Sequence, residues 1–228
     1  MNSRTSFPPS IGGTLRRLRR SRGARHVEMR AGPHIFVFLT AANPSIHPEM
    51  NPEPKPVTLR LLGAEDAAQF RTLRLRGLRE HPPAFLITPE EEERRSVAEI
   101  AERLAPNPDA WVVGAFIEEQ IVGCAGFYRE AEQRVRHKGT VWGVYVAPEA
   151  RGNGYGRRLL EFVIQRAGAM PGLEQILLWV VPTNTAAHTL YQSLGFVTFG
   201  IERNAMKTED GYTDEAFMAL FLHSTIAP

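Results

Sequence analysis

Three glycines at alternate positions form the segment of this sequence that is best suited to chemistry. Gly152 and Gly154 lie between an apolar stretch, residues 144–146, and a helical pattern that begins near Tyr155, and Gly156 falls at the start of that pattern. Without a Cβ, the backbone can approach a ligand closely and adopt a positive φ. The N–H groups at the start of a helix carry a partial positive charge, which favours an anion and above all a phosphate. The alternative interpretation is a tight strand-to-helix connection.

The residues around these glycines distinguish among phosphate-binding motifs. The chain contains no G-x-x-x-x-G-K-[ST] run, which a P-loop requires. A dinucleotide turn, G-x-G-x-x-G, is excluded because Arg157 stands where the third glycine is needed. The pattern that fits is R-x-x-G-x-G, with Arg151 as its first residue and Arg158 as a further cation. It resembles the pyrophosphate loop of the GNAT superfamily of acyl-CoA-dependent N-acyltransferases.

A second motif begins thirty residues after Gly154. Residues 184–196 read NTAAHTLYQSLGF, which is similar to the N-x-x-A-x-x-L-Y-x-x-x-G-F pattern of the same family. Asn184 and Tyr191 are seven positions apart, so on a helix they share a face about two turns apart. Each is also compatible with a structural role, Asn184 as a helix N-cap and Tyr191 as a half-buried ring. The two motifs together, in this order and spacing, favour the family.

The resemblance implies an N-acetyltransferase that uses acetyl-CoA as co-substrate, acts on a small amine or a peptide N-terminus and needs no metal. It implies binding of acetyl-CoA by the strand before the loop, the loop itself and an Asn further on. Here these positions are Val144, Tyr145, Val146, Arg151, Gly152, Asn153, Gly154, Tyr155, Gly156, Arg157 and Asn184. It places the Tyr191 hydroxyl near the CoA sulfur, as the general acid for the leaving thiolate. A non-catalytic acyl-CoA sensor is the alternative, and the presence of Tyr191 favours the enzyme.

The base that accepts the amine proton is not evident from the sequence. An amine with a pKa of ~10.4 is mostly protonated at neutral pH, so a base or a water relay must take its proton. Ribosomal-protein alanine acetyltransferases of this family carry a glutamate five residues before the Asn, where this chain has Trp179. That difference puts a ribosomal-protein substrate in doubt. The candidates that remain, each also compatible with a solvated surface role, are Glu91, Glu92, Glu130, His137 and Asp214. Trp142 and Trp179 suit either an apolar acceptor pocket or core packing.

The apolar pattern predicts the elements that position these motifs. Strands are predicted over residues 56–62, 111–117, 120–128, 140–146, 176–181, 196–201 and 215–222, and helices over 64–79, from Thr88 onward, after the glycine loop and over 184–194. This order matches the GNAT fold. We therefore expect an α+β, three-layer fold. Its central mixed, mostly antiparallel sheet has about six to seven strands, is flanked by about four helices, and is splayed at the strand before the loop.

Charge divides the chain into two parts. Residues 1–55 hold 9 Lys and Arg, 3 Asp and Glu, and 7 of the 17 prolines, whereas the remainder holds 18 basic and 22 acidic residues. We predict a disordered, Arg/Pro-rich extension over residues 1–55 and an N-acetyltransferase domain over 56–224. A natural start at Met29 or Met50 is the favoured explanation of the extension. A signal peptide, an organelle transit peptide and a nucleic-acid-binding arm are the alternatives.

Composition argues against a disulfide-stabilised protein and against a membrane-spanning one. The single cysteine, Cys124, excludes an internal disulfide framework, and its apolar neighbours predict a buried thiol. No apolar run reaches the ~18 residues of a spanning helix. We expect a cytoplasmic protein whose partners are acetyl-CoA and an amine acceptor, without nucleic acid or membrane. The oligomeric state stays open, and a homodimer is one option.

Overall fold

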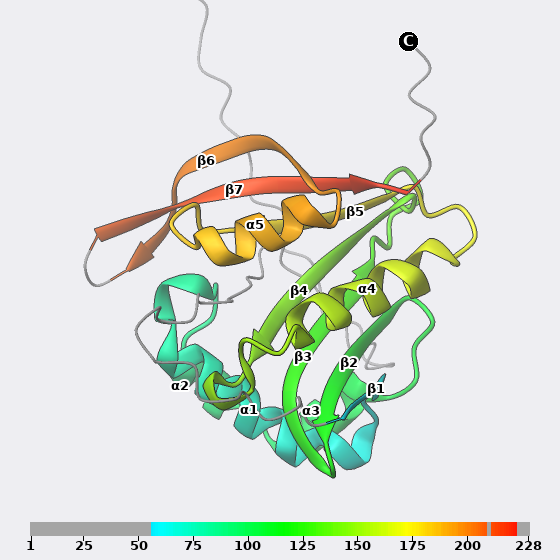
Figure 1. Ribbon diagram of the computed structural model, residues 1–228, viewed down its shortest axis with the longest axis vertical. Coiled ribbons are helices and arrows are strands. Elements are labelled where there is room, and N and C mark those ends of the chain that lie inside the picture. The colour runs from blue at the N-terminus through cyan, green and yellow to red at the C-terminus, as the bar shows by residue number, and fades with distance from the viewer. Residues whose placement is uncertain (1–55, 209–210, 223–228) are drawn as a thin grey trace, which may run out of the picture. The chain divides into compact units, whose positions relative to one another are not determined.

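The computed structural model describes residues 56–208 and 211–222, and the extension predicted over residues 1–55 lies outside them. Seven strands within the described residues form one mixed sheet, in the spatial order β1-β2-β3-β4-β5-β7-β6 (Figure 1). Neighbouring strands are antiparallel except β4 and β5, which are parallel. The strands are β1 (Val57–Leu61), β2 (Ala110–Ile117), β3 (Gln120–Arg129), β4 (Lys138–Val146), β5 (Gln175–Val180), β6 (Val197–Thr208) and β7 (Gly211–Phe221). The predicted mixed, mostly antiparallel sheet is confirmed.

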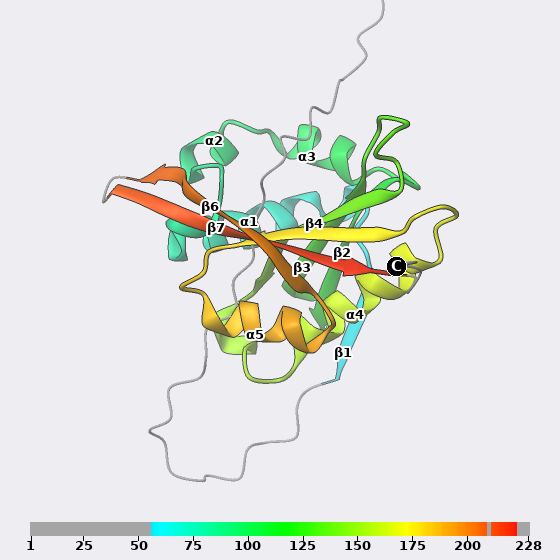
Figure 2. The same ribbon diagram turned by 90° about the horizontal axis from the view of Figure 1, so that it is seen from above.

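Helices cover both faces of this sheet. The α-helices of the described residues are α1 (Ala67–Glu80), α2 (Pro89–Glu93), α3 (Val97–Leu104), α4 (Tyr155–Gly168) and α5 (Thr185–Ser193). Figure 2 shows α1, α2 and α3 on one side of the sheet, here called the α1 face, and α4 and α5 on the other, the α4 face. The described part of the chain has five α-helices, one more than predicted. The sequence pattern did not separate α3 from the acidic segment that forms α2.

Local sequence signals set the ends of several helices. The Thr88 hydroxyl accepts a hydrogen bond from the Glu91 N–H at 3.2 Å, and the Glu91 carboxylate accepts one from the Thr88 N–H at 2.8 Å. This capping box begins α2 at the residue that the sequence predicts. Ser96 starts α3 in the same way, with Glu99 as its partner. Gly195 follows α5 with a φ of 93°, as expected of a helix-ending glycine.

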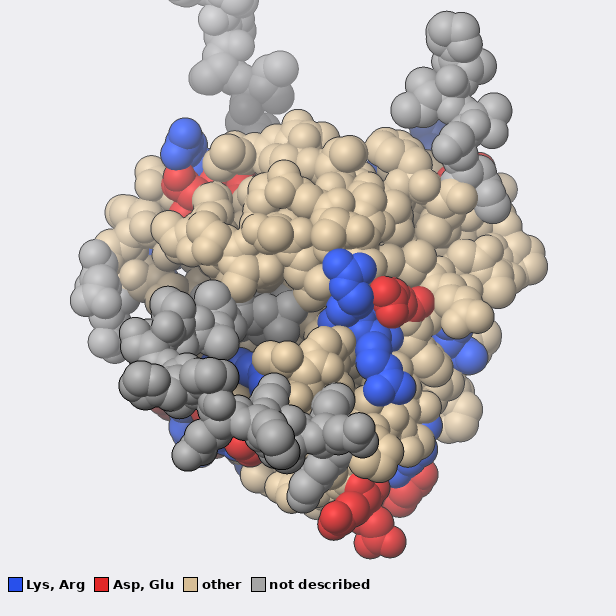
Figure 3. All heavy atoms as spheres, in the orientation of Figure 1, with Lys and Arg blue, Asp and Glu red and all other residues tan. Residues whose placement is uncertain are grey.

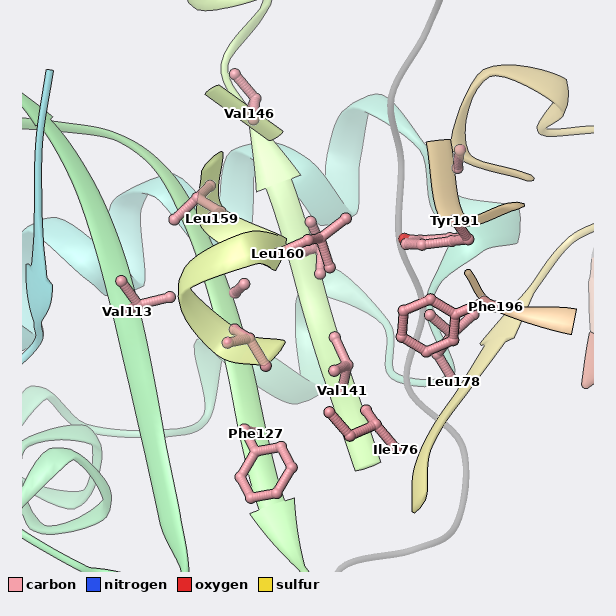
Figure 4. Close-up of a cluster of buried hydrophobic side chains, with 14 of the residues drawn as sticks. Val113, Phe127, Val141, Val146, Leu159, Leu160, Ile176, Leu178, Tyr191 and Phe196 are labelled. Carbon is pink, nitrogen blue, oxygen red and sulfur yellow. The ribbon is translucent and has the colours of Figure 1, made fainter. Parts of the chain in front are cut away.

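Apolar side chains fill the space on both faces of the sheet. On the α4 face, a cluster that Figure 4 shows in part includes Val113, Phe127, Val141, Val146, Leu159, Leu160, Ile176, Leu178, Tyr191 and Phe196. On the α1 face, a second cluster joins α1 and α3 to the sheet and includes Phe70, Ile100, Cys124 and Tyr145. Cys124 is only 2% exposed, which confirms the predicted buried thiol.

Strands β4 and β5 separate after a short parallel contact. Their pairing covers only residues 138–140 and 175–177, although β4 continues to Val146. On its other side β4 carries a β-bulge, in which Gly143 and Val144 stand opposite the single residue Ala125 of β3. Gly143 adopts a φ of 59°. A bulge bends its strand and increases the local twist, which accounts for the departure of β4 from β5. The predicted splay before the glycine loop is present.

The helices of the described residues are short. The longest, α1 and α4, have 14 residues each. None in this part of the chain combines the length and the apolar character that a membrane crossing requires.

Candidate functional site

The glycine loop joins the end of β4 to the start of α4. After a 3-10 turn, Pro148–Ala150, Gly152 and Gly154 adopt φ angles of 81° and 75°, which other residues rarely do. A Cβ built on either glycine would meet no atom of the described structure within 4 Å. Gly154 is the N-cap of α4 and has no side chain with which to cap the first turn. The main chain of this turn therefore suits an anion. Tyr155 and Gly156, which follow, are buried.

Arg151, the first residue of the loop motif, is bound by the protein itself. Its Nε donates to the Val146 carbonyl at 2.9 Å, and an Nη donates to the Glu80 carboxylate at 3.2 Å. The Tyr145 hydroxyl donates to the same carboxylate at 2.7 Å. Burial pushes the pKa of Glu80 up, but hydrogen bonds from Tyr145 and Arg76 hold it below its usual value. Arg151 thus ties the loop to the end of α1, and its contact with a phosphate stays a prediction.

Two further loop residues predicted to bind the co-substrate also make contacts within the protein. The Asn153 amide donates to two carbonyls inside the loop, each at 3.2 Å, and so stabilises the turn. Arg157 donates to the Ser193 hydroxyl of α5 at 2.6 Å and lies 3.5 Å from Glu161. Figure 3 shows basic and acidic atoms side by side on the surface above α4. The Arg157 side chain is 43% exposed, so it remains accessible to an anion at the loop.

Helix α5 brings Asn184 and Tyr191 to the α4 face. Asn184 is the N-cap of α5, and its Oδ1 accepts a hydrogen bond from the Ala187 N–H at 3.2 Å. The structural role considered from the sequence is therefore present, and the role in binding acetyl-CoA stays a prediction. Tyr191 is fully buried, and its ring meets Phe196 edge-on at 5.8 Å. Figure 4 shows its hydroxyl pointing toward Leu160 and strand β4.

The Tyr191 hydroxyl is a buried polar group that makes no hydrogen bond to the described residues. A buried hydroxyl left without a hydrogen bond destabilises the folded protein by about 1–3 kcal/mol. Such a group therefore calls for a structural or functional explanation. Burial raises the pKa of Tyr191 well above its ordinary value. The hydroxyl therefore keeps its proton at neutral pH and can donate it in a hydrogen bond. An acceptor atom between β4 and β5 would satisfy it.

Two tryptophans flank the separated strands on the α1 face. Thr140 of β4 pairs with Leu177 of β5, so Trp142 and Trp179, each two residues further on, stand at the same level and on the same face. Trp179 also contacts Phe217 of β7 edge-on at 5.7 Å. Both tryptophans are half-buried. An aromatic side chain on each side of the separation is compatible with the acceptor pocket considered from the sequence.

A buried cation lies next to Trp142. The Arg74 guanidinium is 5.3 Å from the centre of the Trp142 ring, and its Nε is 3.2 Å from the Glu92 carboxylate. Glu92 is fully buried and also accepts a hydrogen bond from Arg95 at 2.5 Å. A Cβ on Gly143 would lie 3.1 Å from Arg74 Nη1, so this cation reaches the bulge of β4. Because two arginines engage Glu92, its carboxylate is poorly suited to accept a proton from a substrate.

The other base candidates are engaged elsewhere. Glu91 is exposed and completes the capping box of α2. Asp214 accepts hydrogen bonds from a side chain and a main-chain N–H of β6, which hold the pKa of Asp214 below its usual value. The Glu130 carboxylate accepts a hydrogen bond from the Thr140 hydroxyl at 3.3 Å, at the end where β4 and β5 are still paired, and burial raises the pKa of Glu130. His137 precedes β4 at this same end.

One carboxylate that sequence reasoning missed is Glu215 of β7. It is only 1% exposed. It alternates with Phe217, so its side chain lies on the α1 face, the same face as Trp179. Burial, with a smaller contribution from Glu202, raises the pKa of Glu215 to about 7. The signal that could have found it is the position of a carboxylate at the start of the apolar run 215–222, in register with its inward-facing residues.

Comparison with known proteins agrees with the motifs. The acetyltransferase (GNAT) family model matches residues 75–196, more than half of the chain. The chain is 39% identical over 88 residues to the [ribosomal protein bS18]-alanine N-acetyltransferase of Escherichia coli K12, covering 39% of this chain and 59% of that protein. It is 31% identical over 157 residues to the mycothiol acetyltransferase of Thermobispora bispora, covering 65% of this chain and 49% of that protein. The matches thus span between about half and three fifths of these relatives.

Comparison of the fold with solved structures agrees with the sequence comparison. A crystal structure of an acetyltransferase of the GNAT family from Streptococcus pneumoniae superposes with a TM-score of 0.62 at 26% identity, over 73% of this chain and 99% of that one. The glycine loop, Asn184 and Tyr191 all fall within the residues that the family model matches. Sequence motifs, sheet topology and family model agree, and this chain belongs to the acetyltransferase (GNAT) family.

Proposed function

We propose that this protein is an N-acetyltransferase that transfers the acetyl group of acetyl-CoA to the primary amine of a small molecule or a peptide N-terminus. The observation that carries the proposal is the early end of the β4–β5 pairing beside a helix that begins at a bare glycine. An anion bound at this helix start would lie next to a strand edge that β5 leaves unpaired. A pyrophosphate attached to an extended, hydrogen-bonding arm is a ligand that needs both.

Each part of acetyl-CoA has a matching part of the site. The main-chain N–H groups of residues 152–156, with Arg157 nearby, suit the pyrophosphate. The edge of β4 over Val144, Tyr145 and Val146 suits the amides of pantetheine, which would bond it as an added strand does. Asn184 begins α5 and is the residue that family resemblance assigns to the same arm. Arg151 contributes by holding the loop in place.

The chemistry is a direct transfer. The amine nitrogen attacks the thioester carbonyl, the new N–C bond forms, and the C–S bond breaks to release the CoA thiolate. A thiol of pKa ~8.5 is a moderate leaving group, so a donor near the sulfur accelerates the step. Tyr191 presents a protonated, buried hydroxyl without a described partner, toward the region between the strands. We propose that this hydroxyl donates to the sulfur as the thiolate leaves.

The acceptor is proposed only as a class. The two relatives described above are named for a ribosomal-protein alanine and for mycothiol, which are chemically different compounds. This chain also has Trp179 where family resemblance places a glutamate in the ribosomal-protein enzymes. Primary amine is therefore the class that we propose, and a panel of amino acids, polyamines, aminoglycosides and peptides would identify the acceptor through release of CoA thiol.

A matched pair of glycine variants tests the co-substrate site. Gly154→Ala and Gly172→Ala each force a side chain into a positive φ, 75° and 71°, but Gly172 lies beyond α4, outside the loop. Both variants should lose a similar amount of free energy of unfolding. Only Gly154→Ala should weaken acetyl-CoA binding in calorimetry, by roughly 10- to 100-fold, because a Cβ would stand between the main chain and the pyrophosphate. Equal affinities in the two folded variants would refute the phosphate assignment.

A further inference from the structure

Glu215 lies on the α1 face at the open end of the separated strands. The last paired residues of β5 and β7 are Val180 and Ala216, so Glu215 stands at the level of Val181, one position beyond the pairing. Trp179 pairs with Phe217 on the same strands. Because alternate residues of a strand share a face, Glu215 is the next inward-facing residue after Phe217. It is therefore adjacent to the aromatic side chains that flank the separation.

The buried cluster on the α1 face, next to the level of Glu215, is apolar. The cluster on this side of the sheet joins α1, the turn Pro82–Ala84, β5 and β6, and consists of Leu75, Leu78, Ala84, Phe85, Val181 and Met206, with Trp179 packed against it. Met206 pairs with Thr213, two residues before Glu215 and on the same face. A carboxylate enclosed in this way keeps its proton to a higher pH than one in water.

A carboxylate on the neighbouring strand acts in the same direction as burial. Glu202 of β6 pairs directly with Glu215, and this like charge makes ionisation of Glu215 less favourable. The result is a carboxyl group that is half-ionised close to neutral pH, with a pKa of about 7. A general base is most effective when its pKa is near the working pH.

We propose that Glu215 is the group that takes the proton from the acceptor amine, directly or through one water, in the transfer proposed above. The acceptor arrives as an ammonium ion and gives one proton to the Glu215 carboxylate. The free amine attacks the thioester, the N–C bond forms and the C–S bond breaks. The nitrogen then loses its second proton to solvent, and the thiolate gains one by way of Tyr191. Amide, CoA thiol and one released proton balance the reaction.

Position favours Glu215 over the other carboxylates. Glu92 is engaged by two arginines, and Asp214 by Arg203 and the Asn204 N–H. The Glu130 carboxylate accepts a hydrogen bond from the Thr140 hydroxyl at 3.3 Å, in the part of β4 that is still paired with β5 and not at the open end. Glu215 lies two residues from Phe217, which pairs with Trp179 at the level of Trp142.

Three variants test this step in the full chain. In the wild type at saturating acetyl-CoA and acceptor, the pH profile of kcat should have an ascending limb, in which kcat rises with pH, centred near pH 7. Glu215→Gln should lower kcat at pH 7.5 by roughly 10²–10⁴-fold and abolish that limb, while the dissociation constant of acetyl-CoA stays unchanged. Glu202→Gln should keep activity and move the limb to lower pH, because it removes the like charge. Asp214→Asn, a matched neighbour, should change neither the rate nor the limb.

The outcomes separate this inference from the proposed function. Turnover with an unaltered rate and limb in Glu215→Gln, or a limb that does not move in Glu202→Gln, would overturn the role of Glu215 alone. Tight binding of acetyl-CoA without turnover of any amine would overturn the proposed function and the proton step with it. A readout that needs no turnover is carbon-13 NMR of labelled glutamate carboxyls. The resonance missing from Glu215→Gln should titrate near neutrality, and a midpoint below about 5 would overturn the inference.

Discussion

The cost of burying Glu215 should be measurable as a pH-dependent loss of stability. Its pKa rises from an ordinary value of 4.5 to about 7 in the folded chain. Below pH 4.5 Glu215 is protonated in both the folded and the unfolded chain, so its burial does not lower the free energy of unfolding. Between these two values the unfolded chain ionises first, so stability falls as pH rises through about 7. Each pKa unit corresponds to about 1.4 kcal/mol, so the full cost at pH 8 and above is about 3 kcal/mol.

The assay compares thermal unfolding of Glu215→Gln and wild type at pH 5 and pH 8. A glutamine keeps the size of the side chain but never ionises, so any fixed cost of its amide cancels between the two pH values. The variant should gain about 2.5 kcal/mol relative to wild type over this range. For a chain of this length that gain is a relative rise in Tm of about 5–10 °C. A difference in Tm that is the same at both pH values would refute the reasoning about burial.

Three further predictions concern other buried groups. Tyr191→Phe should lower turnover by roughly 10²–10⁴-fold with an unchanged calorimetric affinity for acetyl-CoA; unchanged turnover would show that the hydroxyl has no part in the transfer. Arg74→Met should destabilise the protein by about 3 kcal/mol in urea unfolding, because it removes one partner of the buried Glu92 charge, and Glu92→Gln should restore part of the loss. Burial raises the pKa of Cys124 to about 12, so Ellman's reagent at pH 8 should react roughly 1000-fold more slowly with the native than with the unfolded chain; similar rates would contradict the buried position.

Short-range patterns in the sequence determined the order of the elements and the place of the loop. Thr88 and Pro89 begin α2 because a capping box is closed by residues three apart. Gly152 and Gly154 adopt the positive φ angles that their residue type permits. The seven-residue spacing of Asn184 and Tyr191 placed them on one helix, with Asn184 at its start. In each case the interacting groups are close in the chain, so the signal is local.

The ends of the last two strands were less well predicted. The sequence suggested residues 196–201 and 215–222, whereas β6 runs from Val197 to Thr208 and β7 from Gly211 to Phe221. Residues 202–208 are mostly polar, because the hairpin extends beyond the core and much of its surface faces solvent. Pairing with the neighbouring strand, rather than an apolar pattern, keeps these residues extended. A method based on apolar alternation therefore ends the strands too early.

Only the tertiary structure decided what faces the site. Trp142 and Trp179 stand level because two strands pair for three residues and then separate. Arg151 ties the loop to α1 through Glu80, seventy-one residues away in the sequence. Glu215 looks like an ordinary strand carboxylate until α1, the turn after it and β6 enclose its face in apolar side chains. Its pKa depends on which distant segments exclude water from it, and no local pattern encodes that, because solvation is a property of the assembled fold.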